Sequence, residues 1–169
     1  ITGSVEVDEF NLLGTINAGS FVLNAGAGSE IVTLNGSLNT GVVSVDGEGG
    51  NDTFAVASGA SLSGTSVSLS GGTGLDKFTF DGSVTANSLS VSGGDDADTL
   101  ALNVAGTLIA KSITLDGDKG ADTFTLDGTL RDSDSGVDAD ATFITIDGGA
   151  DNDIITVDIA RNDVGCPRV

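Results

Sequence analysis

Apolar and polar residues alternate along this chain in short runs that recur at a nearly constant interval. A run such as Val43-Ser44-Val45 is followed along the chain by a second run of the same kind, Phe54-Ala55-Val56. Alternate residues of a strand point to the same side, so the outer two residues of each run are expected to face a common core. No 3.6-residue period is present, which favours strands over helices.

A third and weaker apolar position follows each pair of runs, with Gly and small polar residues on both sides. It is occupied by Leu38, Leu62, Val84, Leu108 and Leu130. Three short sides and three turns within 22–24 residues describe one coil of a solenoid. We therefore predict an all-β, right-handed parallel β-helix of roughly six to seven coils, with equivalent residues of adjacent coils about 4.8 Å apart.

A glycine-rich turn that ends in an acidic residue separates the two main runs of each coil. The turns read GEGGND (47–52), GGTGLD (71–76), GGDDAD (93–98), GDKGAD (117–122) and GGADND (148–153), with a worn copy, AGAGSE, at 25–30. The acids that end these turns are 22, 24, 22, 24 and 31 residues apart: Glu30, Asp52, Asp76, Asp98, Asp122 and Asp153. Stacked coils would bring these carboxylates into one column. The first glycine of each turn (47, 71, 93, 117 and 148) is expected to supply backbone freedom at positive φ.

The whole chain, residues 1–169, is predicted to be one solenoid domain. Residues 1–20 resemble a degenerate first coil, 131–140 an acidic loop inserted at one corner, and 159–169 a tail. The absence of Met suggests a piece of a longer polypeptide. Cys166 is the one cysteine and cannot form an internal disulfide.

The charge and composition of the chain argue against several classes of binding partner and of catalysis. Twenty-five acids against six bases give a net charge of −19, which argues against nucleic acid and anionic membranes and favours divalent cations and an extracellular location. No apolar run is long enough to insert into a membrane. The chain has no His, which excludes imidazole catalysis and the usual zinc sites. We therefore expect a non-catalytic protein.

A column of carboxylates carries an electrostatic cost. Two such groups about 4.8 Å apart repel by roughly 1 kcal/mol in bulk water and roughly 3.5 kcal/mol at an effective dielectric of 20. Bound cations, raised pKa values, or side chains that turn to water or accept backbone N–H groups would each relieve it. Further acids at the same corner favour cations: Asp46, Asp95, Asp96, Asp116, Asp118, Asp147 and Asp151.

The turn and the start of the strand after it resemble a known calcium-binding repeat. Residues 71–79, Gly-Gly-Thr-Gly-Leu-Asp-Lys-Phe-Thr, fit the G-G-x-G-x-D-x-U-x nonapeptide of repeats-in-toxin (RTX) proteins, and the other turns fit it in part. The resemblance implies Ca²⁺ held between adjacent coils by the six acids and by backbone carbonyls. RTX nonapeptides follow one another without a gap, whereas this chain has one turn per coil, so at most one row of ions is expected. In this respect the chain is more similar to the spaced repeats of long bacterial surface proteins.

These observations predict a non-catalytic structural or adhesin-like segment of a secreted or cell-surface bacterial protein, with calcium bound along its acidic turns and further domains beside it. One alternative is a metal-free unit that assembles end to end into a filament. Another is an ice-binding or surface-binding face built on one outward column, Thr33, Ala55, Thr79, Ala101, Thr125 and Thr156.

Overall fold

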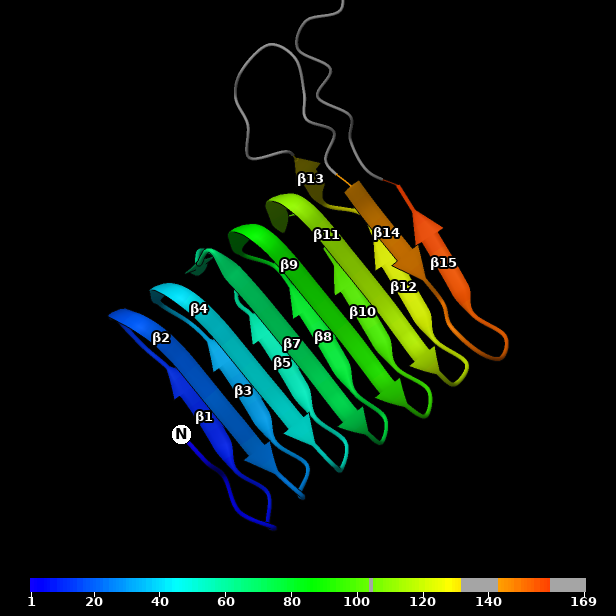
Figure 1. Ribbon diagram of the computed structural model, residues 1–169, viewed down its shortest axis with the longest axis horizontal. Coiled ribbons are helices and arrows are strands. Elements are labelled where there is room, and N and C mark those ends of the chain that lie inside the picture. Colours follow the sequence, from blue (N-terminus) through cyan, green and yellow to red (C-terminus); the bar gives the residue numbers. More distant parts are fainter. Residues whose placement is uncertain (104, 132–142, 159–169) are drawn as a thin grey trace, which may run out of the picture.

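A computed structural model describes residues 1–103, 105–131 and 143–158 (Figure 1). The predicted tail, with Cys166, lies outside the described residues, as does the predicted acidic loop apart from Arg131. Every element in the described part is a β-strand. No helix there has the length and apolarity needed to cross a bilayer.

The strands form two parallel sheets that face each other across a common core. One sheet has the order β1 (Glu9–Leu12), β3 (Ile31–Leu34), β5 (Thr53–Val56), β8 (Lys77–Phe80), β10 (Thr99–Leu102), β12 (Thr123–Leu126) and β15 (Ile154–Val157). The other contains β2 (Thr15–Gly26), β4 (Ser37–Glu48), β6 (Ser61–Ser63), β7 (Ser66–Thr73), β9 (Ser83–Asp95), β11 (Thr107–Lys119), β13 (Thr129–Arg131) and β14 (Phe143–Asp147). The predicted all-β parallel solenoid is confirmed, with about five complete turns.

The strand register follows the repeat that the sequence predicts. Phe54 lies opposite Phe78, and their rings stack with centroids 5.1 Å apart. Phe124 lies opposite Ile155, although 31 residues separate the two in sequence, so the register resumes after the long coil. The outward column expected on this sheet also forms in register, for example with Thr79 opposite Ala101.

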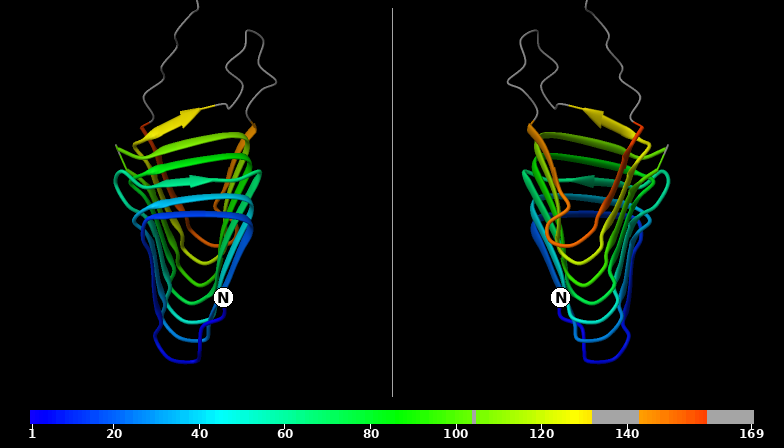
Figure 2. Two further views of the ribbon diagram at one scale, coloured as in Figure 1. Left: turned by 90° about the vertical axis from the view of Figure 1, so that its left-hand side faces the viewer. Right: turned by 90° about the vertical axis from the view of Figure 1, so that its right-hand side faces the viewer.

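Seen end-on, each coil tapers from a broad side to the narrow, glycine-rich turn (Figure 2). The three predicted sides are present, but two of them belong to single long strands in most coils. β2, β4, β9 and β11 run continuously around the corner for 12 or 13 residues. β6 and β7 in one coil, and β13 and β14 in another, are separate strands. The backbone ladder continues across that corner, where the Thr65 N–H bonds to the Gly41 carbonyl at 2.7 Å.

The core is a thin layer of small branched side chains and phenylalanines. Leu38, Leu62, Val84 and Leu108, which the sequence gives as the weaker apolar positions, are all buried. In the last described coil the exposed fractions of Ile155 and Val157 are 45% and 49%, because no later described coil covers them. Burial therefore depends on stacking of the next coil, as expected for a solenoid.

Candidate functional site

The acids that end the glycine-rich turns form one internal row along the narrow edge of the solenoid. Glu30, Asp52, Asp76, Asp98 and Asp122 have exposed fractions of 0–5%, and Asp153 in the last coil is half-buried. The predicted stacking of these six side chains is therefore confirmed. The structure places them inside the coil.

Hydrogen bonds connect the members of the row in one direction. The backbone N–H of Asp52 donates to Oδ1 of Asp76 in the next coil at 2.7 Å, and the N–H of Asp76 donates to Oδ1 of Asp98 at the same distance. The bonds Glu30–Asp52, Asp98–Asp122 and Asp122–Asp153 repeat this pattern at 2.7, 2.7 and 3.0 Å. One oxygen of each aspartate in the row thus satisfies a backbone N–H group of the preceding coil.

The second carboxylate oxygen has no such role. Oδ2 of Asp76, Asp98 and Asp122 is buried without a hydrogen-bond partner. The carboxyls of Glu30 and Asp52 are also buried, and a hydrogen bond between these two side chains contributes to the rise in the pKa of Glu30. Leaving a buried polar atom unpaired costs about 1–3 kcal/mol, and a charged one costs more. The row therefore requires some form of neutralisation.

The first glycine of each turn makes room for that second oxygen. A Cβ atom added at Gly71 would lie 2.2 Å from Oδ2 of Asp76 and 2.5 Å from the carbonyl oxygen of Gly93 in the next coil. Equivalent contacts of 2.2–2.3 Å to Oδ2 occur at the corresponding glycines, Gly47, Gly93, Gly117 and Gly148. None of these five glycines has a positive φ, so the prediction that they supply backbone freedom at positive φ is wrong. The position excludes a side chain because the carboxylate occupies that space.

Positive φ occurs at the second and fourth positions of the turns. Gly72 and Gly74 have φ of 107° and 120°, and where glycine is replaced, Glu48, Asp96, Asp118 and Asp151 have φ of 68–86°. Nearby acids support these turns: Asp46, Asp116 and Asp147 accept the N–H of the residue two positions later at 3.0–3.1 Å. Several of the extra corner acids therefore hold the turn in shape, as Asx turns do.

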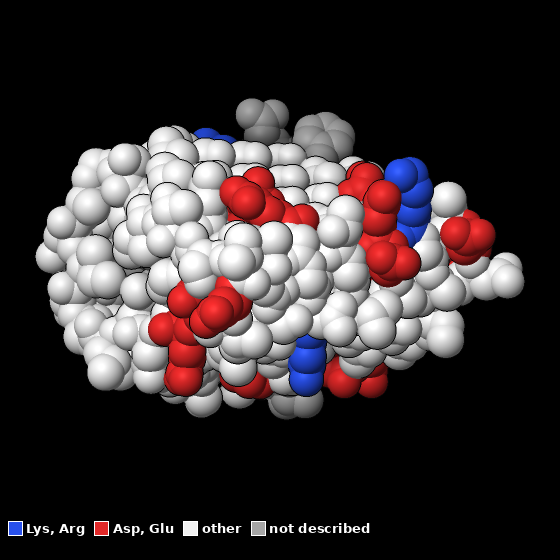
Figure 3. All heavy atoms as spheres, turned by 90° about the horizontal axis from the view of Figure 1, so that it is seen from below, with Lys and Arg blue, Asp and Glu red and all other residues white. Residues whose placement is uncertain are grey.

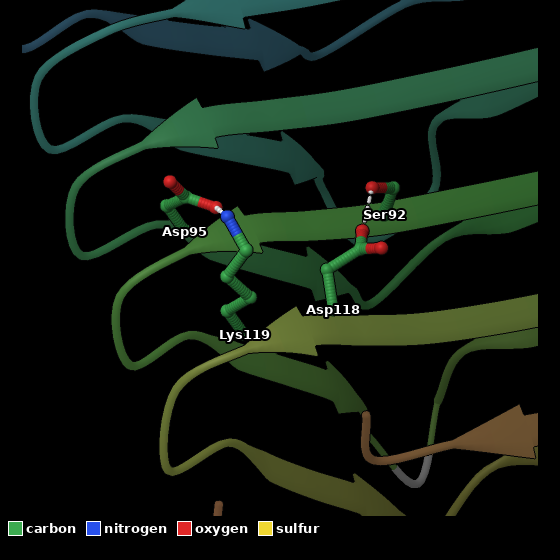
Figure 4. A network of polar contacts seen from close by, with 4 residues as sticks. All are labelled: Ser92, Asp95, Asp118 and Lys119. Carbon is green, nitrogen blue, oxygen red and sulfur yellow. Dashed lines mark hydrogen bonds and ion pairs between the residues drawn. The ribbon is translucent and has the colours of Figure 1, made fainter. Parts of the chain in front are cut away.

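Other corner acids lie on the outer surface and pair there. Viewed from the side of the turns, the exposed acids form separate groups on the surface (Figure 3). Lys119 binds Asp95 at 2.7 Å, and Ser92 donates to Asp118 (Figure 4). Within the described ranges, no three Asp, Glu, His or Cys side chains converge on a common position for a metal ion.

Burial raises the pKa of every acid in the internal part of the row. The pKa of Asp98 rises to about 7, chiefly through desolvation, with repulsion from Asp76 and Asp122 adding to the effect. Desolvation also raises the pKa of Asp76 to about 6, although the N–H of Asp52 lowers it in part. Desolvation is also the main cause that raises the pKa values of Glu30, Asp52 and Asp122.

The row has a further member that the sequence analysis did not include. Asp8 lies one coil before Glu30: its carbonyl accepts the Ile31 N–H at 2.9 Å, as the Glu30 carbonyl accepts the Thr53 N–H at 2.8 Å. Asp8 is half-buried, and its Oδ2 accepts the N–H of Ser4 at 2.6 Å. The detectable signal is Gly3, which precedes Asp8 by five residues as Gly47 precedes Asp52. The turn lacks the second glycine, which hides it from a motif search.

No family model, no curated protein and no solved structure matches this chain. Inferences about function therefore rest on the chemistry of the row and on the shape of the solenoid.

Proposed function

We propose that this chain is a non-catalytic structural segment of a secreted or cell-surface protein, a stiff β-helical rod that spaces or displays neighbouring domains. Support comes from the single continuous core that runs through the stacked coils and from the repeated in-register pairing of their strands. The lack of His and the net charge of −19 favour an extracellular structural role over catalysis or binding to nucleic acid.

We further propose that bound calcium neutralises the charge of the acid row. The main support is the set of buried carboxylate oxygens that have no hydrogen-bond partner. Ca²⁺ prefers carboxylate and carbonyl oxygens, and both types lie close together beside Gly71, Oδ2 from Asp76 and the carbonyl oxygen from Gly93. The residues therefore fit the group that the RTX resemblance implies.

The residues that would hold the ions are those of the row, Glu30, Asp52, Asp76, Asp98, Asp122 and Asp153, together with the carbonyls of the glycines that face them. Bound Ca²⁺ would supply the positive charge that these buried groups lack. Such a rod would be unstable at low calcium and would fold after export into a calcium-rich exterior.

Thermal unfolding with and without calcium tests this proposal. Chelation is expected to lower the Tm, and millimolar Ca²⁺ to restore it, whereas the same concentration of Mg²⁺ restores little because Mg²⁺ gives up its water shell reluctantly. Asp98→Asn should reduce the calcium-dependent rise in Tm. Asp127→Asn, a half-buried acid outside the row, is the matched control and should leave it unchanged. Identical melting curves with and without Ca²⁺ would reject the calcium role and leave the structural role intact.

End-to-end assembly is a second candidate function, favoured by the terminal strands. β15 and β1 are the outer strands of one sheet, and β15 carries the exposed side chains of Ile155 and Val157. Parallel pairing of β15 with β1 of a second copy would continue the register of the sheet. Such head-to-tail contacts do not close on themselves and generate filaments.

A further inference from the structure

The acid row ends in an unused hydrogen-bond donor at Asp153. From Glu30 to Asp122, the backbone N–H of each acid donates to Oδ1 of the acid in the next coil, and Asp153 receives the last of these bonds. No described residue accepts the N–H of Asp153 itself. Its carbonyl is likewise without a described donor, whereas the Asp122 carbonyl accepts the Ile154 N–H at 2.8 Å.

The opposite end of the row, at Asp8, has an unused acceptor. Oδ2 of Asp8 accepts the N–H of Ser4 and would lie 3.0 Å from a Cβ atom added at Gly3, so it holds the place of Oδ2 beside the first glycine of the later turns. In those turns Oδ1 accepts the N–H of the preceding coil. No described donor reaches Oδ1 of Asp8.

The apolar side chains at the two ends also correspond. β1 and β15 lie at opposite ends of one sheet (Figure 1). When the register is followed from strand to strand, Phe10 is level with Ile155. Leu12 is level with Val157 in the same way. The side chains at these two positions are buried in every coil with a neighbour on both sides, but only partly buried in β1 and exposed in β15.

The turns at the two ends have the same length. Thr2 and Asp147 are level with each other in the register of the second sheet. Asp8 follows Thr2 by six residues, and Asp153 follows Asp147 by six residues. Stacking the two ends would therefore align both sheets and the turn between them at once.

We propose that the N-terminal end of one copy stacks on the C-terminal end of another, with the Asp153 N–H of one copy donating to Oδ1 of Asp8 in the next. The inference rests on the end-to-end assembly proposed above and adds its register and its direction. The Glu9 N–H would donate to the Asp153 carbonyl, as the Ile154 N–H does to Asp122. A donor meets an acceptor in this direction only, because two C-terminal ends would bring two donors together. The acid row then continues across each junction.

Disulfide crosslinking tests the register. Asn11 and Thr156 are exposed and level with each other, so across the junction their Cα atoms would lie about 4.8 Å apart, within the range of a disulfide. Asn11→Cys combined with Thr156→Cys, in a chain with Cys166→Ser, should give a ladder of multimers on mild oxidation. Asn11→Cys with Ile154→Cys is the control: the two positions would be about 8 Å apart and should crosslink poorly.

Mixing single-cysteine chains tests the direction. Chains with Asn11→Cys alone or Thr156→Cys alone should not crosslink to themselves, whereas an equal mixture of the two should give dimers and nothing larger. Crosslinking of Thr156→Cys chains to one another would show that two C-terminal ends meet and would overturn the inference.

The role of the Asp8 carboxylate is tested by sedimentation velocity. Asp8→Ala removes the acceptor and should weaken association by about tenfold. Glu9→Ala removes the same charge from the adjacent exposed side chain and is the matched control, with association unchanged. Circular dichroism shows whether each variant is folded. A wild-type chain that is monomeric at every concentration would overturn both this inference and end-to-end assembly. Association that is equally strong in Asp8→Ala and Glu9→Ala, or equal crosslinking of the two cysteine pairs, would overturn this inference alone.

Discussion

Oδ1 of Asp76 accepts the backbone N–H of Asp52, one coil earlier, at 2.7 Å. The same carboxylate leaves Oδ2 buried and without a partner. The side chain therefore has two separable roles, one as a neutral hydrogen-bond acceptor and one as a charge that must be offset. Substitutions that remove only one of them distinguish the two.

Asp76→Asn retains an oxygen for the Asp52 N–H and removes the charge. Without divalent cations at pH 8, this variant is expected to be more stable than the wild type by about 1–2 kcal/mol, because an unpaired buried charge is lost. Asp76→Ala removes the acceptor as well and should cost about 1–3 kcal/mol. Urea unfolding of both variants, with and without Ca²⁺, measures the difference. Equal destabilisation by Asn and Ala would contradict the separation of roles.

A second prediction follows from the close approach of the Asp76 carboxylate to Gly71. Gly71→Ala should destabilise the fold by about 1–3 kcal/mol, because the added methyl group meets Oδ2 of Asp76 and the Gly93 carbonyl. Gly19→Ala is the control: a Cβ there has nothing within 4 Å, so its effect should stay within about 0.5 kcal/mol.

Ala25 and Glu30 occupy the positions of Gly71 and Asp76 two repeats earlier, which indicates how the Gly71 substitution could be relieved. Adding Asp76→Glu to Gly71→Ala reproduces that pair and should recover part of the lost stability. A double-mutant cycle measures the coupling free energy between the two positions. Strictly additive effects would show that the two positions are independent.

Stability should depend on pH when divalent cations are absent. The pKa values of Asp76 and Asp98 are raised to about 6 and about 7 in the folded state, so folding favours the protonated forms. Their contribution to stability is then present at low pH and is lost as pH rises through these values. The Tm is expected to increase as pH falls from 8 towards 5, and saturating Ca²⁺ should flatten this dependence. A calcium-free Tm that falls steadily over the same range would contradict the raised pKa values.

The terminal strands predict association at high concentration. Sedimentation velocity should show species larger than the monomer that grow with protein concentration. Ile155→Lys places a charge on the exposed end of the core and should return the chain to a monomer, because a buried lysine would oppose stacking. A wild-type chain that stays monomeric at all concentrations would remove this candidate function.

Strand alternation and the spacing of the acids were sufficient to predict the solenoid and the column of acids, but not that this column lies inside the coil. Val43 and Val45 face the core because a strand has a period of two, and Asp52 stacks on Asp76 because the coils have nearly equal length. The role of Gly71 could not be predicted in this way. Whether a glycine is present for its φ or for the space beside it depends on the position of a side chain five residues later.

The sequence pattern also did not predict that two sides of a coil form one long strand. The corner at Gly41 lies within the continuous strand β4, whereas the corner at Gly64 and Thr65 separates β6 from β7. Both corners consist of glycine and small polar residues, so the sequence does not distinguish them. Asp8 was missed for a related reason. Its turn retains the spacing to Gly3 but carries other residues at the positions where Gly72 and Gly74 have positive φ.

From Glu30 to Asp153, the hydrogen bonds of the acid row run from the backbone of one coil to the side chain of the next coil towards the C-terminus. Consider a polypeptide that enters a new compartment with its N-terminus first. The backbone N–H group at the acidic turn of its most recently folded coil would lack an acceptor until the carboxylate of the next coil follows. Each arriving repeat would complete the one before it. Assembly of the rod would then advance stepwise in the direction of translocation, and every intermediate would carry a single incomplete end.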